Sequence, residues 1–492
     1  MDADTAHRPT SVPGPARRNI TQDAVVIVPG IMGSELLDTT TGSTVWGLSS
    51  VRWLLKAWTR SDGFAALRMT DDELEGKTGR IRPVQLMRHS AWTPYLKGSE
   101  PYTDLITGVN GCVADPTAVL EFAYDWRLPV ATNGKLLAEA ARRHLTAWRS
   151  HPAHDSARRA RVDERPARLV FVAHSMGGLV TQTALDPLHD SDLAADTRAV
   201  FTLATPFYGA VKAAAILNTG RGAPVPLPHQ QLQRLCATMP GLHDLLPQYA
   251  CVLDRDDARR LTPSDVAALG GHRELAALAA DAASKRSAIS LPGHRAVAGT
   301  GQITWQSLTL DSGIIRPHCH TVRRHSDGSL IRMSDGSPEP FDVMGDGTVH
   351  KESAALGPAV TPLPLQHGAA ATDRSAVKAV QELLRDDVHL GPPMGGPGCG
   401  LEVPDLATAG TPWEVSITGV SAPADVTCEV GLVDDASTAT SPRLRLVKRR
   451  VTGRVDTSQP GLYRVSVRTR DRSTVTQLVL VTASGLETDQ VE

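Results

Sequence analysis

The chain has 492 residues, more than a single hydrophobic core usually supports, so we expect a large domain with a smaller one attached. The 51 basic and 53 acidic side chains nearly balance, which gives no sign of a nucleic-acid partner; the six cysteines form no Cys-x-x-Cys pair. Residues 1–22 lack the apolar stretch of a secretory signal or membrane anchor, so we expect a disordered N-terminal arm on a cytoplasmic protein.

The first ordered elements read as buried strands that alternate with helices. Ala24–Val28 is an apolar run closed by Pro-Gly, and Arg168–Ala173 and Arg198–Ala204 are runs of the same kind. Between them, Gly134–Arg149 repeats its apolar residues at helical spacing. Strand-helix alternation of this kind predicts an α/β domain around a parallel sheet.

Two stretches interrupt this alternation and are too long for connecting loops, 46–112 and 208–293. We expect them to cover the carboxyl edge of the sheet as a cap and a lid. Gly- and Pro-rich residues then indicate a linker, and the alternating apolar pattern beyond it indicates an immunoglobulin-like β-sandwich. The predicted boundaries are an arm at 1–22, an α/β domain at 23–388, a linker at 389–398, a sandwich at 399–484 and a tail at 485–492.

A candidate nucleophile lies where the second buried strand meets a helix. Ala173–Gly178 reads Ala-His-Ser-Met-Gly-Gly, with Ser175 at the centre. This context is typical of the nucleophile elbow of the α/β-hydrolase fold, in which small flanking residues leave room for a sharp, strained turn. Ala173 departs mildly from the glycine usual at that flank. The motif predicts that Ser175 carries out nucleophilic catalysis.

A serine nucleophile needs a histidine to take its proton and a carboxylate to orient that histidine. The fold's chain order of Ser, acid and His favours Asp346, in Gly-Asp-Gly-Thr-Val, with Asp342 as a weaker alternative. His367 follows the last apolar run and precedes an amphipathic helix, which is the position expected of the base. His350 is the alternative.

Two backbone amides must stabilise the oxyanion that forms when an ester is attacked. We expect Met176, directly after the nucleophile, to provide one of them. The loop after the first strand, Val28–Ser34, provides the other, with Ile31 as the donor.

These motifs together resemble the lecithin:cholesterol acyltransferase family, which includes lysosomal phospholipase A2 and phospholipid:diacylglycerol acyltransferase. The resemblance spans roughly 23–384. Besides the elbow and the Pro-Gly-x-x-Gly loop, four ordered matches carry it: the Asp-Trp-Arg signature in Ala123–Arg127, then Thr205–Gly209, Leu242–Pro247 and Gly299–Gly301.

The resemblance implies a lipase, phospholipase or O-acyltransferase that acts on lipid acyl esters through an acyl-enzyme. It assigns Ser175 as nucleophile, Asp346 as acid, His367 as base, and the amides of Ile31 and Met176 as the oxyanion hole. Water as acceptor would give hydrolysis, and a lipid alcohol would give acyl transfer. Two departures matter, because Cys112 stands alone in the cap where secreted relatives have a disulfide, and because Ile31 gives no reason to expect an acidic pH optimum.

Partners are less well specified by the sequence. Val51–Trp58 could be an interfacial membrane anchor in the cap or a packed cap segment, and Gly220–Pro228 could be a mobile lid. We predict no metal, since His318, Cys319, His320 and His325 match no recognised spacing, and no cofactor. An alternative function is a membrane-damaging effector hydrolase that the C-terminal sandwich recruits to a protein partner.

Overall fold

The computed structural model describes residues 20–483, except 48–63, 89–101, 160, 162–164, 222–228, 255–256, 326, 358–359, 387–398, 405, 434, 448–449 and 470–473. Its centre is a six-stranded sheet in the order β15-β10-β7-β6-β1-β5, in which every neighbouring pair is parallel. These strands are β1 (Ala24–Val28), β5 (Val119–Glu121), β6 (Leu169–His174), β7 (Thr197–Leu203), β10 (Arg295–Thr300) and β15 (Val360–Pro364).

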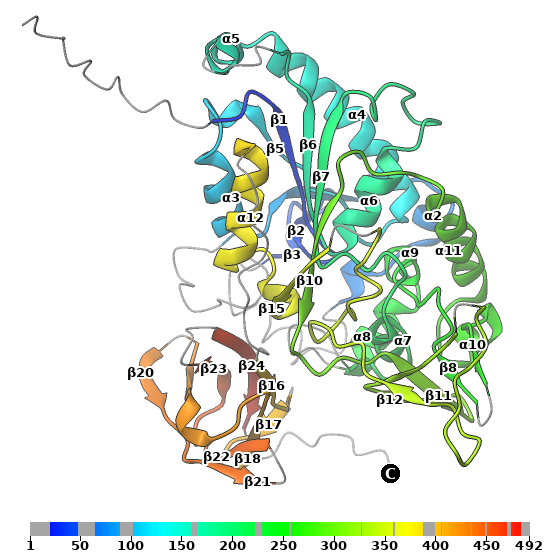
Figure 1. Ribbon diagram of the computed structural model, residues 1–492, viewed down its shortest axis with the longest axis vertical. Helices are drawn as coiled ribbons and strands as arrows, with labels where there is room; N and C mark the ends of the chain where they lie inside the picture. The colour runs from blue at the N-terminus through cyan, green and yellow to red at the C-terminus, as the bar shows by residue number, and fades with distance from the viewer. Residues whose placement is uncertain are drawn as a thin grey trace, which may run out of the picture.

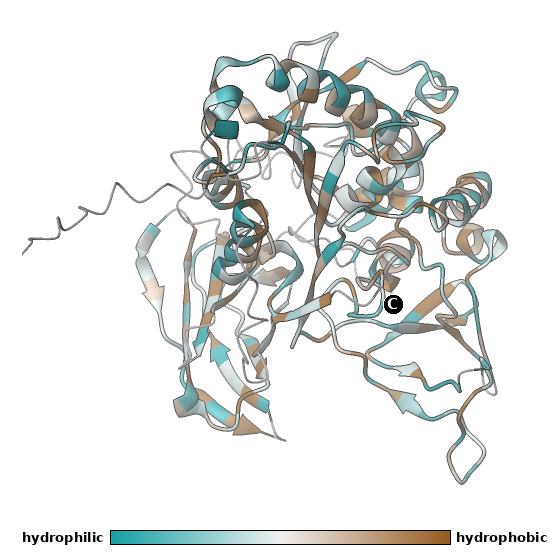
Figure 2. Cartoon of the chain, turned by 45° about the horizontal axis from the view of Figure 1, so that its top comes forward, coloured by the Kyte–Doolittle hydropathy of each residue, from teal (hydrophilic) through white to brown (hydrophobic). Residues whose placement is uncertain are grey.

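Helices cover both faces of this sheet (Figure 1), which explains why its central strands are apolar along their whole length. On one side lie α3 (Thr103–Asn110) and α12 (Arg374–Arg385), and on the other lie α4 (Val130–Arg149) and α6 (Met176–Ala184). In Figure 2 the central strands are predominantly hydrophobic. The predicted α/β-hydrolase fold class is therefore confirmed, with three predicted strands within one residue of their observed bounds.

Within the region 46–112, β4 (Ile81–Leu86) joins two strands that precede most of the region, β2 (Ser34–Asp38) and β3 (Thr44–Trp46), in a small antiparallel sheet of order β3-β2-β4. The other described elements of the region are η1 (Ala65–Leu67), α2 (Asp71–Leu74) and α3. The candidate membrane segment Val51–Trp58 lies outside the described residues. No helix in the described part of the chain is long and apolar enough to span a bilayer.

The region 208–293 is mainly helical. It contains α7 (Val211–Thr219), α8 (His229–Cys236), α9 (Pro240–His243), α10 (Pro263–Ala268) and α11 (Arg273–Arg286), with short strands β8 (Val252–Leu253) and β9 (Ala258–Arg259). These strands join β11 (Ser307–Asp311) and β12 (Ile314–His318) in a second small sheet; β13 (Thr321–Val322) and β14 (Pro340–Phe341) form a separate pair. Most of the candidate lid Gly220–Pro228 lies outside the described residues.

The C-terminal part is a two-sheet β-sandwich with its own core. One sheet has the order β16-β18-β22-β21 and the other β17-β24-β23-β19-β20. In immunoglobulin notation these are A-B-E-D and G-F-C-C′, with β17 added beside G. The hydroxyl of Tyr463, near the start of strand F, donates to the carbonyl of Gln459 at 3.0 Å, as in an immunoglobulin tyrosine corner. The predicted immunoglobulin-like architecture is thus observed.

The strands of the sandwich, in chain order, are β16 (Gly400–Glu402), β17 (Leu406–Thr408), β18 (Trp413–Thr418), β19 (Val426–Leu432), β20 (Asp435–Thr440), β21 (Leu444–Val447), β22 (Arg450–Val455), β23 (Gly461–Thr469) and β24 (Thr474–Thr482). The predicted linker 389–398 lies outside the described residues, as does the predicted tail 485–492.

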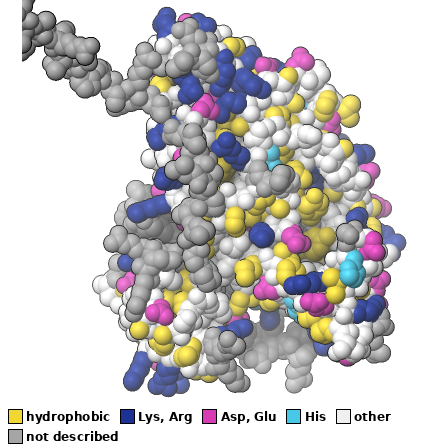
Figure 3. Space-filling view, in the orientation of Figure 1, with side chains coloured by type: hydrophobic (Ala, Val, Ile, Leu, Met, Phe, Trp, Pro, Cys, Tyr) yellow, Lys and Arg dark blue, Asp and Glu magenta, His cyan; other side chains and the backbone are white. Residues whose placement is uncertain are grey.

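Arginines that form ion pairs with Asp23 lie at the amino end of the central sheet. Figure 3 shows Lys and Arg side chains gathered where α5 (Pro152–Arg159) lies. Asp23 is fully buried there, and although burial raises its pKa, Arg165 and Arg198 outweigh that effect and lower it. Thr21, at the end of the stretch predicted as an arm, is buried, and its amide donates to the carbonyl of Cys112 at 2.7 Å.

Candidate active site

Ser175 occupies a sharp turn between β6 and α6. Its backbone has φ 52° and ψ −127°, a region that side-chain-bearing residues rarely adopt, as expected of a nucleophile elbow. The two glycines after it let α6 approach its neighbours. A Cβ on Gly177 would lie 2.4 Å from the carbonyl oxygen of Pro29, and one on Gly178 would lie 2.1 Å from the hydroxyl of Thr205. Both glycines are therefore needed for close packing.

Asp346 lies in a tight turn of the segment between β14 and β15. Its Oδ1 accepts hydrogen bonds from the amides of Thr348 and Val349, at 2.9 and 2.7 Å. This contact fixes the carboxylate, whose side chain is fully buried, so that Oδ2 faces His367. The competing Asp342 is engaged elsewhere, since its Oδ1 accepts from Gln306 at 2.6 Å.

His367 begins η3 (His367–Ala369), directly after β15. Its Nδ1 donates to Asp346 Oδ2 at 2.8 Å, and its Nε2 lies 2.8 Å from the Oγ of Ser175. Its backbone amide also donates to the carbonyl of Asp346 at 2.9 Å. The alternative His350 instead packs its ring edge-on against Tyr249, with 4.7 Å between centroids. The structure thus brings the three predicted residues together in the order Ser, His, Asp.

A second hydrogen-bonded chain, not predicted from the sequence, runs behind the nucleophile. The amide of Gly30 donates to the hydroxyl of Tyr102 at 2.8 Å, and that hydroxyl lies 2.8 Å from Nδ1 of His174. Nε2 of His174 lies 3.1 Å from the backbone carbonyl of His367. A carbonyl can only accept, so Nε2 carries the proton and Nδ1 accepts from Tyr102.

This chain links three segments of the site. Gly30 belongs to the loop after β1, His174 immediately precedes the nucleophile, and His367 is the candidate base. Burial, reinforced by the neighbouring His367, lowers the pKa of His174 to about 3, so its ring is neutral near pH 7. His174 was visible in the elbow motif, but no local pattern marks Tyr102, which lies 72 residues away from it.

The loop after β1 lies directly against the nucleophile. A Cβ on Gly30 would be 2.9 Å from Cβ of Ser175, so only glycine fits without movement. The next residues, Ile31 and Met32, line the same cavity as Ser175, and Met32 has a φ of 64°. Met176 is the first residue of α6, where a backbone N–H has no acceptor within the helix. The two predicted oxyanion donors therefore flank the turn that holds Ser175.

An apolar cavity opens at this cluster. Ser175 and His367 form part of its wall, and Trp46, Phe64 and Trp126 contribute aromatic surface. Lys212 also lines it, with its Nζ held 3.1 Å from the carbonyl of Gly347. Helices α7–α9 and the residues beside them supply many of the remaining apolar side chains: Ala213, Ile216, Leu232, Leu235, Cys236, Met239, Leu242 and Leu245.

The Asp-Trp-Arg signature supports the wall of this cavity. The guanidinium of Arg127 is fully buried and donates to Asp125 Oδ2 at 2.7 Å and to Glu73 of α2 at 2.8 Å. Trp126 lines the cavity and packs edge-on against Trp46 at 5.3 Å between centroids. The signature thus joins the region 46–112 to the central sheet. Among the described residues, no group of three or more His, Cys, Asp or Glu side chains could hold a metal ion.

Residues 93–267 match the model of the lecithin:cholesterol acyltransferase family, a span that includes Ser175 and ends before Asp346 and His367. No curated protein matches the chain. Among solved structures, a lipase of Bacillus licheniformis is similar at 14% identity and a TM-score of 0.31, covering 77% of this chain and 96% of its own.

A superoxide reductase of Ignicoccus hospitalis is similar at 9% identity and a TM-score of 0.14, covering 18% of this chain and 80% of its own. Both structural likenesses are distant, and the strand order and the elbow geometry of this chain define its fold. The resemblance to the lecithin:cholesterol acyltransferase family is confirmed over residues 93–267, and with the α/β-hydrolase fold it supports an enzyme that acts on acyl esters.

Proposed function

We propose that the protein is a serine lipase, phospholipase or O-acyltransferase that forms an acyl-enzyme on Ser175. The observation that carries this proposal is the continuous contact from Ser175 Oγ through His367 to Asp346, with both distances 2.8 Å, at the wall of an apolar cavity. Hydroxyl, imidazole and carboxylate in this order form the arrangement that activates a serine.

The first half of the reaction follows from this geometry. As Ser175 Oγ attacks the ester carbonyl, its proton passes to Nε2 of His367, and Asp346 stabilises the imidazolium through Nδ1–H. The amides of Ile31 and Met176 stabilise the oxyanion of the tetrahedral intermediate. When that intermediate collapses, the ester C–O bond breaks, and the leaving alcohol takes the proton from His367. The acyl group remains on Ser175.

The second half decides between hydrolysis and transfer. Water or an alcohol gives its proton to Nε2 of His367 and attacks the acyl-enzyme. The bond between the acyl carbon and Ser175 Oγ then breaks, His367 returns the proton to Oγ, and a fatty acid or a new ester is released. The triad treats the two acceptors alike, so the outcome depends on which of them reaches the acyl group. Product analysis with and without a long-chain alcohol distinguishes the two reactions.

The cavity supports a long apolar acyl group as the substrate's main binding element. Its walls are mostly apolar side chains, and burying one methylene stabilises binding by about 0.8 kcal/mol. A chain bound there would place its ester carbonyl beside Ser175 and the loop at Ile31. We therefore propose lipid acyl esters as the substrate class, and peripheral contact with a lipid surface as the mode of access.

The test combines covalent labelling with product analysis. The wild-type protein should react with a fluorophosphonate probe and release fatty acid from phospholipid vesicles or long-chain esters. Ser175→Ala should abolish labelling and lower kcat by a factor of about 10⁴ or more, because it removes the nucleophile. Ser191→Ala, on an exposed loop, should match the wild type. A wild-type protein inert to the probe and to every acyl ester would refute the proposal.

A further inference from the structure

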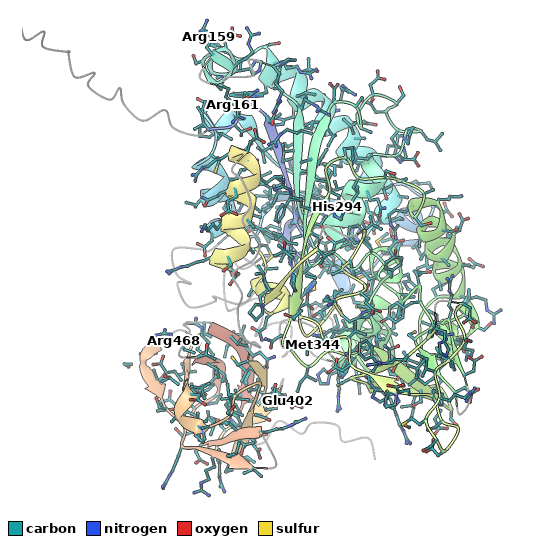
Figure 4. All side chains as sticks on the ribbon, viewed as in Figure 1. Arg159, Arg161, His294, Met344, Glu402 and Arg468 are labelled. Carbon is teal, nitrogen blue, oxygen red and sulfur yellow. The ribbon has the colours of Figure 1, made fainter. Side chains whose placement is uncertain are left out.

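The β-sandwich packs against the part of the chain that carries the candidate acid and base. Figure 1 shows β24 and β16 beneath the carboxyl ends of β10 and β15, and Figure 4 labels Met344 and Glu402 on the two sides of this junction. The fit is close, because a Cβ on Gly400 would lie 3.0 Å from the carbonyl oxygen of Gly301. Two glutamines, Gln302 and Gln366, cross the junction.

Gln302 connects the sandwich to the loop of the acid. Its side-chain amide donates to the carbonyl of Cys399 at 2.7 Å, directly before β16, and its side chain is buried. Its backbone amide donates to the carbonyl of Gly345 at 3.0 Å, and Gly345 immediately precedes Asp346. The carbonyl of Gln302 accepts from Thr304, whose hydroxyl accepts the amide of Gly347 at 2.9 Å. Residues on both sides of Asp346 are thereby tied to Gln302.

Gln366 connects the sandwich to the base. It immediately precedes His367, and its Oε1 accepts the backbone amide of Thr476 in β24 at 3.1 Å. The pairing of β17 with β24 covers Leu480–Thr482, so Thr476 lies beyond it. The hydrogen bond of this amide is therefore accepted by the side chain of Gln366, from the α/β domain, and not by a neighbouring strand.

Apolar packing supports these two hydrogen bonds. Val433, Leu462 and Leu480 belong to the sandwich in sequence, but they are buried within the main core of the α/β domain, with Leu478 packed against it. Val475, Val479 and Val481 lie in the core of the sandwich, as the alternation of a strand requires. One face of β24 thus holds the sandwich together, and the other binds it to the α/β domain.

We propose that the sandwich positions the catalytic acid and base, with Gln302 and Gln366 as its positioning residues. This inference rests on the proposed function and assigns the sandwich a role within the active site. Asp346 and His367 lie on loops, and the hydrogen bond between them is productive only in a narrow geometry. Contacts from a rigid β-sheet restrict both loops at once.

Substitution by glutamate should have opposite effects at the two contacts, and both variants are tested in the full-length protein. Gln302 acts as a donor, so Gln302→Glu places a carboxylate against the carbonyl of Cys399 and should lower kcat as much as Gln302→Ala. Gln366 acts as an acceptor, so Gln366→Glu keeps the contact and should retain the activity that Gln366→Ala loses. We expect each damaging variant to lower kcat on a soluble short-chain ester by about tenfold or more, with KM little changed.

Activity is compared on the alkaline plateau of the pH profile, where His367 is neutral whatever the charge at position 366. Gln381→Ala is the matched control, because Gln381 also donates from its side chain to a backbone carbonyl, that of Gly108 at 3.1 Å, but joins α12 to α3. It should retain wild-type kcat. Thermal unfolding of every variant identifies any that has lost its fold. Because Gln366→Glu keeps the acceptor that Gln366→Ala removes, it shows whether the loss of kcat at that position is due to the loss of the hydrogen bond.

Hydrogen exchange provides a readout that needs no activity. Peptides that contain Asp346 and His367 should exchange faster in Gln302→Ala and Gln366→Ala than in the wild type or in Gln381→Ala. Unchanged kcat and unchanged exchange in both variants would overturn the inference and leave the sandwich as an independent module. A wild-type protein without esterase activity would refute the proposed function. The exchange comparison would still show whether the sandwich restricts the segments that carry Asp346 and His367.

Discussion

At the scale of single residues, the hydroxyl of Tyr102 has the most specific consequence. It accepts from Gly30 in the loop of the candidate oxyanion hole and donates to His174, beside the nucleophile. Tyr102→Phe leaves both partners buried and unpaired, which costs about 1–3 kcal/mol for such a group. We expect urea denaturation to show a loss of this size in the free energy of unfolding.

The same substitution should lower kcat more than it raises KM, because it loosens the loop that stabilises the transition state rather than the cavity that binds the acyl chain. Steady-state kinetics on one ester measures this split. Tyr208→Phe is the control, since Tyr208 is 41% exposed. Wild-type kcat and stability in Tyr102→Phe would show that the hydroxyl chain has no functional role.

The candidate catalytic residues differ in how far the sequence could specify them. Ser175 was predictable from its own turn, because the elbow is a local motif with a steric reason for each small residue. Asp346 and His367 required the chain order of the fold, and the structure places His367 against Ser175 and Asp346 against His367. Tyr102 and Gln302 act through contacts with residues distant in sequence, and neither lies in a pattern that distinguishes it from an ordinary tyrosine or glutamine.

At the scale of elements, helix α8 should determine how long an acyl chain the enzyme accepts. Leu232, Leu235 and Cys236 of this helix are buried and line the cavity. Leu235→Trp would fill part of that space, so kcat/KM should fall by about tenfold or more for a long-chain ester and change little for an acetyl ester. Rates across a series of p-nitrophenyl esters provide the measurement.

A matched change on the surface controls for the size of the new side chain. Leu278 in α11 is 65% exposed, and Leu278→Trp should leave the chain-length profile unaltered. A Leu235→Trp variant that loses activity equally on all chain lengths would indicate damage to the fold and would argue against α8 as part of the acyl site.

The elements themselves were predictable in proportion to their burial and length. The central strands were located within a residue because both of their faces are buried, which gives continuous apolar runs. Helix α4 begins four residues earlier than expected, at Val130, since the polar Asn133 is buried there and interrupts the apolar pattern. Strands of two residues, such as β8 and β13, are too short to show any periodicity.

At the scale of the whole molecule, the sequence predicted a second domain but not its docking. The alternating pattern indicated a β-sandwich, and the observed order of its strands is that of an immunoglobulin domain. Which face of β24 meets the α/β domain depends on Leu478 and Leu480, and alternation alone does not distinguish an interface from a solvent-exposed face. The contacts that dock the sandwich, made by Gln302 and Gln366, join residues far apart in the sequence, so no local pattern predicts them.

Buried histidines distributed over the molecule predict loss of stability in mild acid. Burial lowers the pKa of five of them: His144, His174, His243, His294 and His350. The pKa falls to about 3 for His174 and to about 4 for His350. In the unfolded chain they take up protons near pH 6.5, whereas in the folded protein they take them up only at lower pH. Their stabilisation is therefore complete above that pH and declines as the pH falls through about 6.5.

Asp244 acts in the opposite direction, because burial raises its pKa to about 6, so the folded protein takes up its proton first. One carboxyl does not offset His174 and His350, each worth up to about 1.4 kcal/mol per pH unit, and the free energy of unfolding should fall by about 2 kcal/mol between about pH 7 and pH 5. Urea denaturation across this range measures the slope. His144→Gln keeps a donor for the carbonyl of Ala118, 3.0 Å away, and removes one titrating group, so the slope should become shallower. A flat profile in the wild type would mean that these rings are protonated in the folded state, and an unchanged slope in His144→Gln would place the acid sensitivity elsewhere.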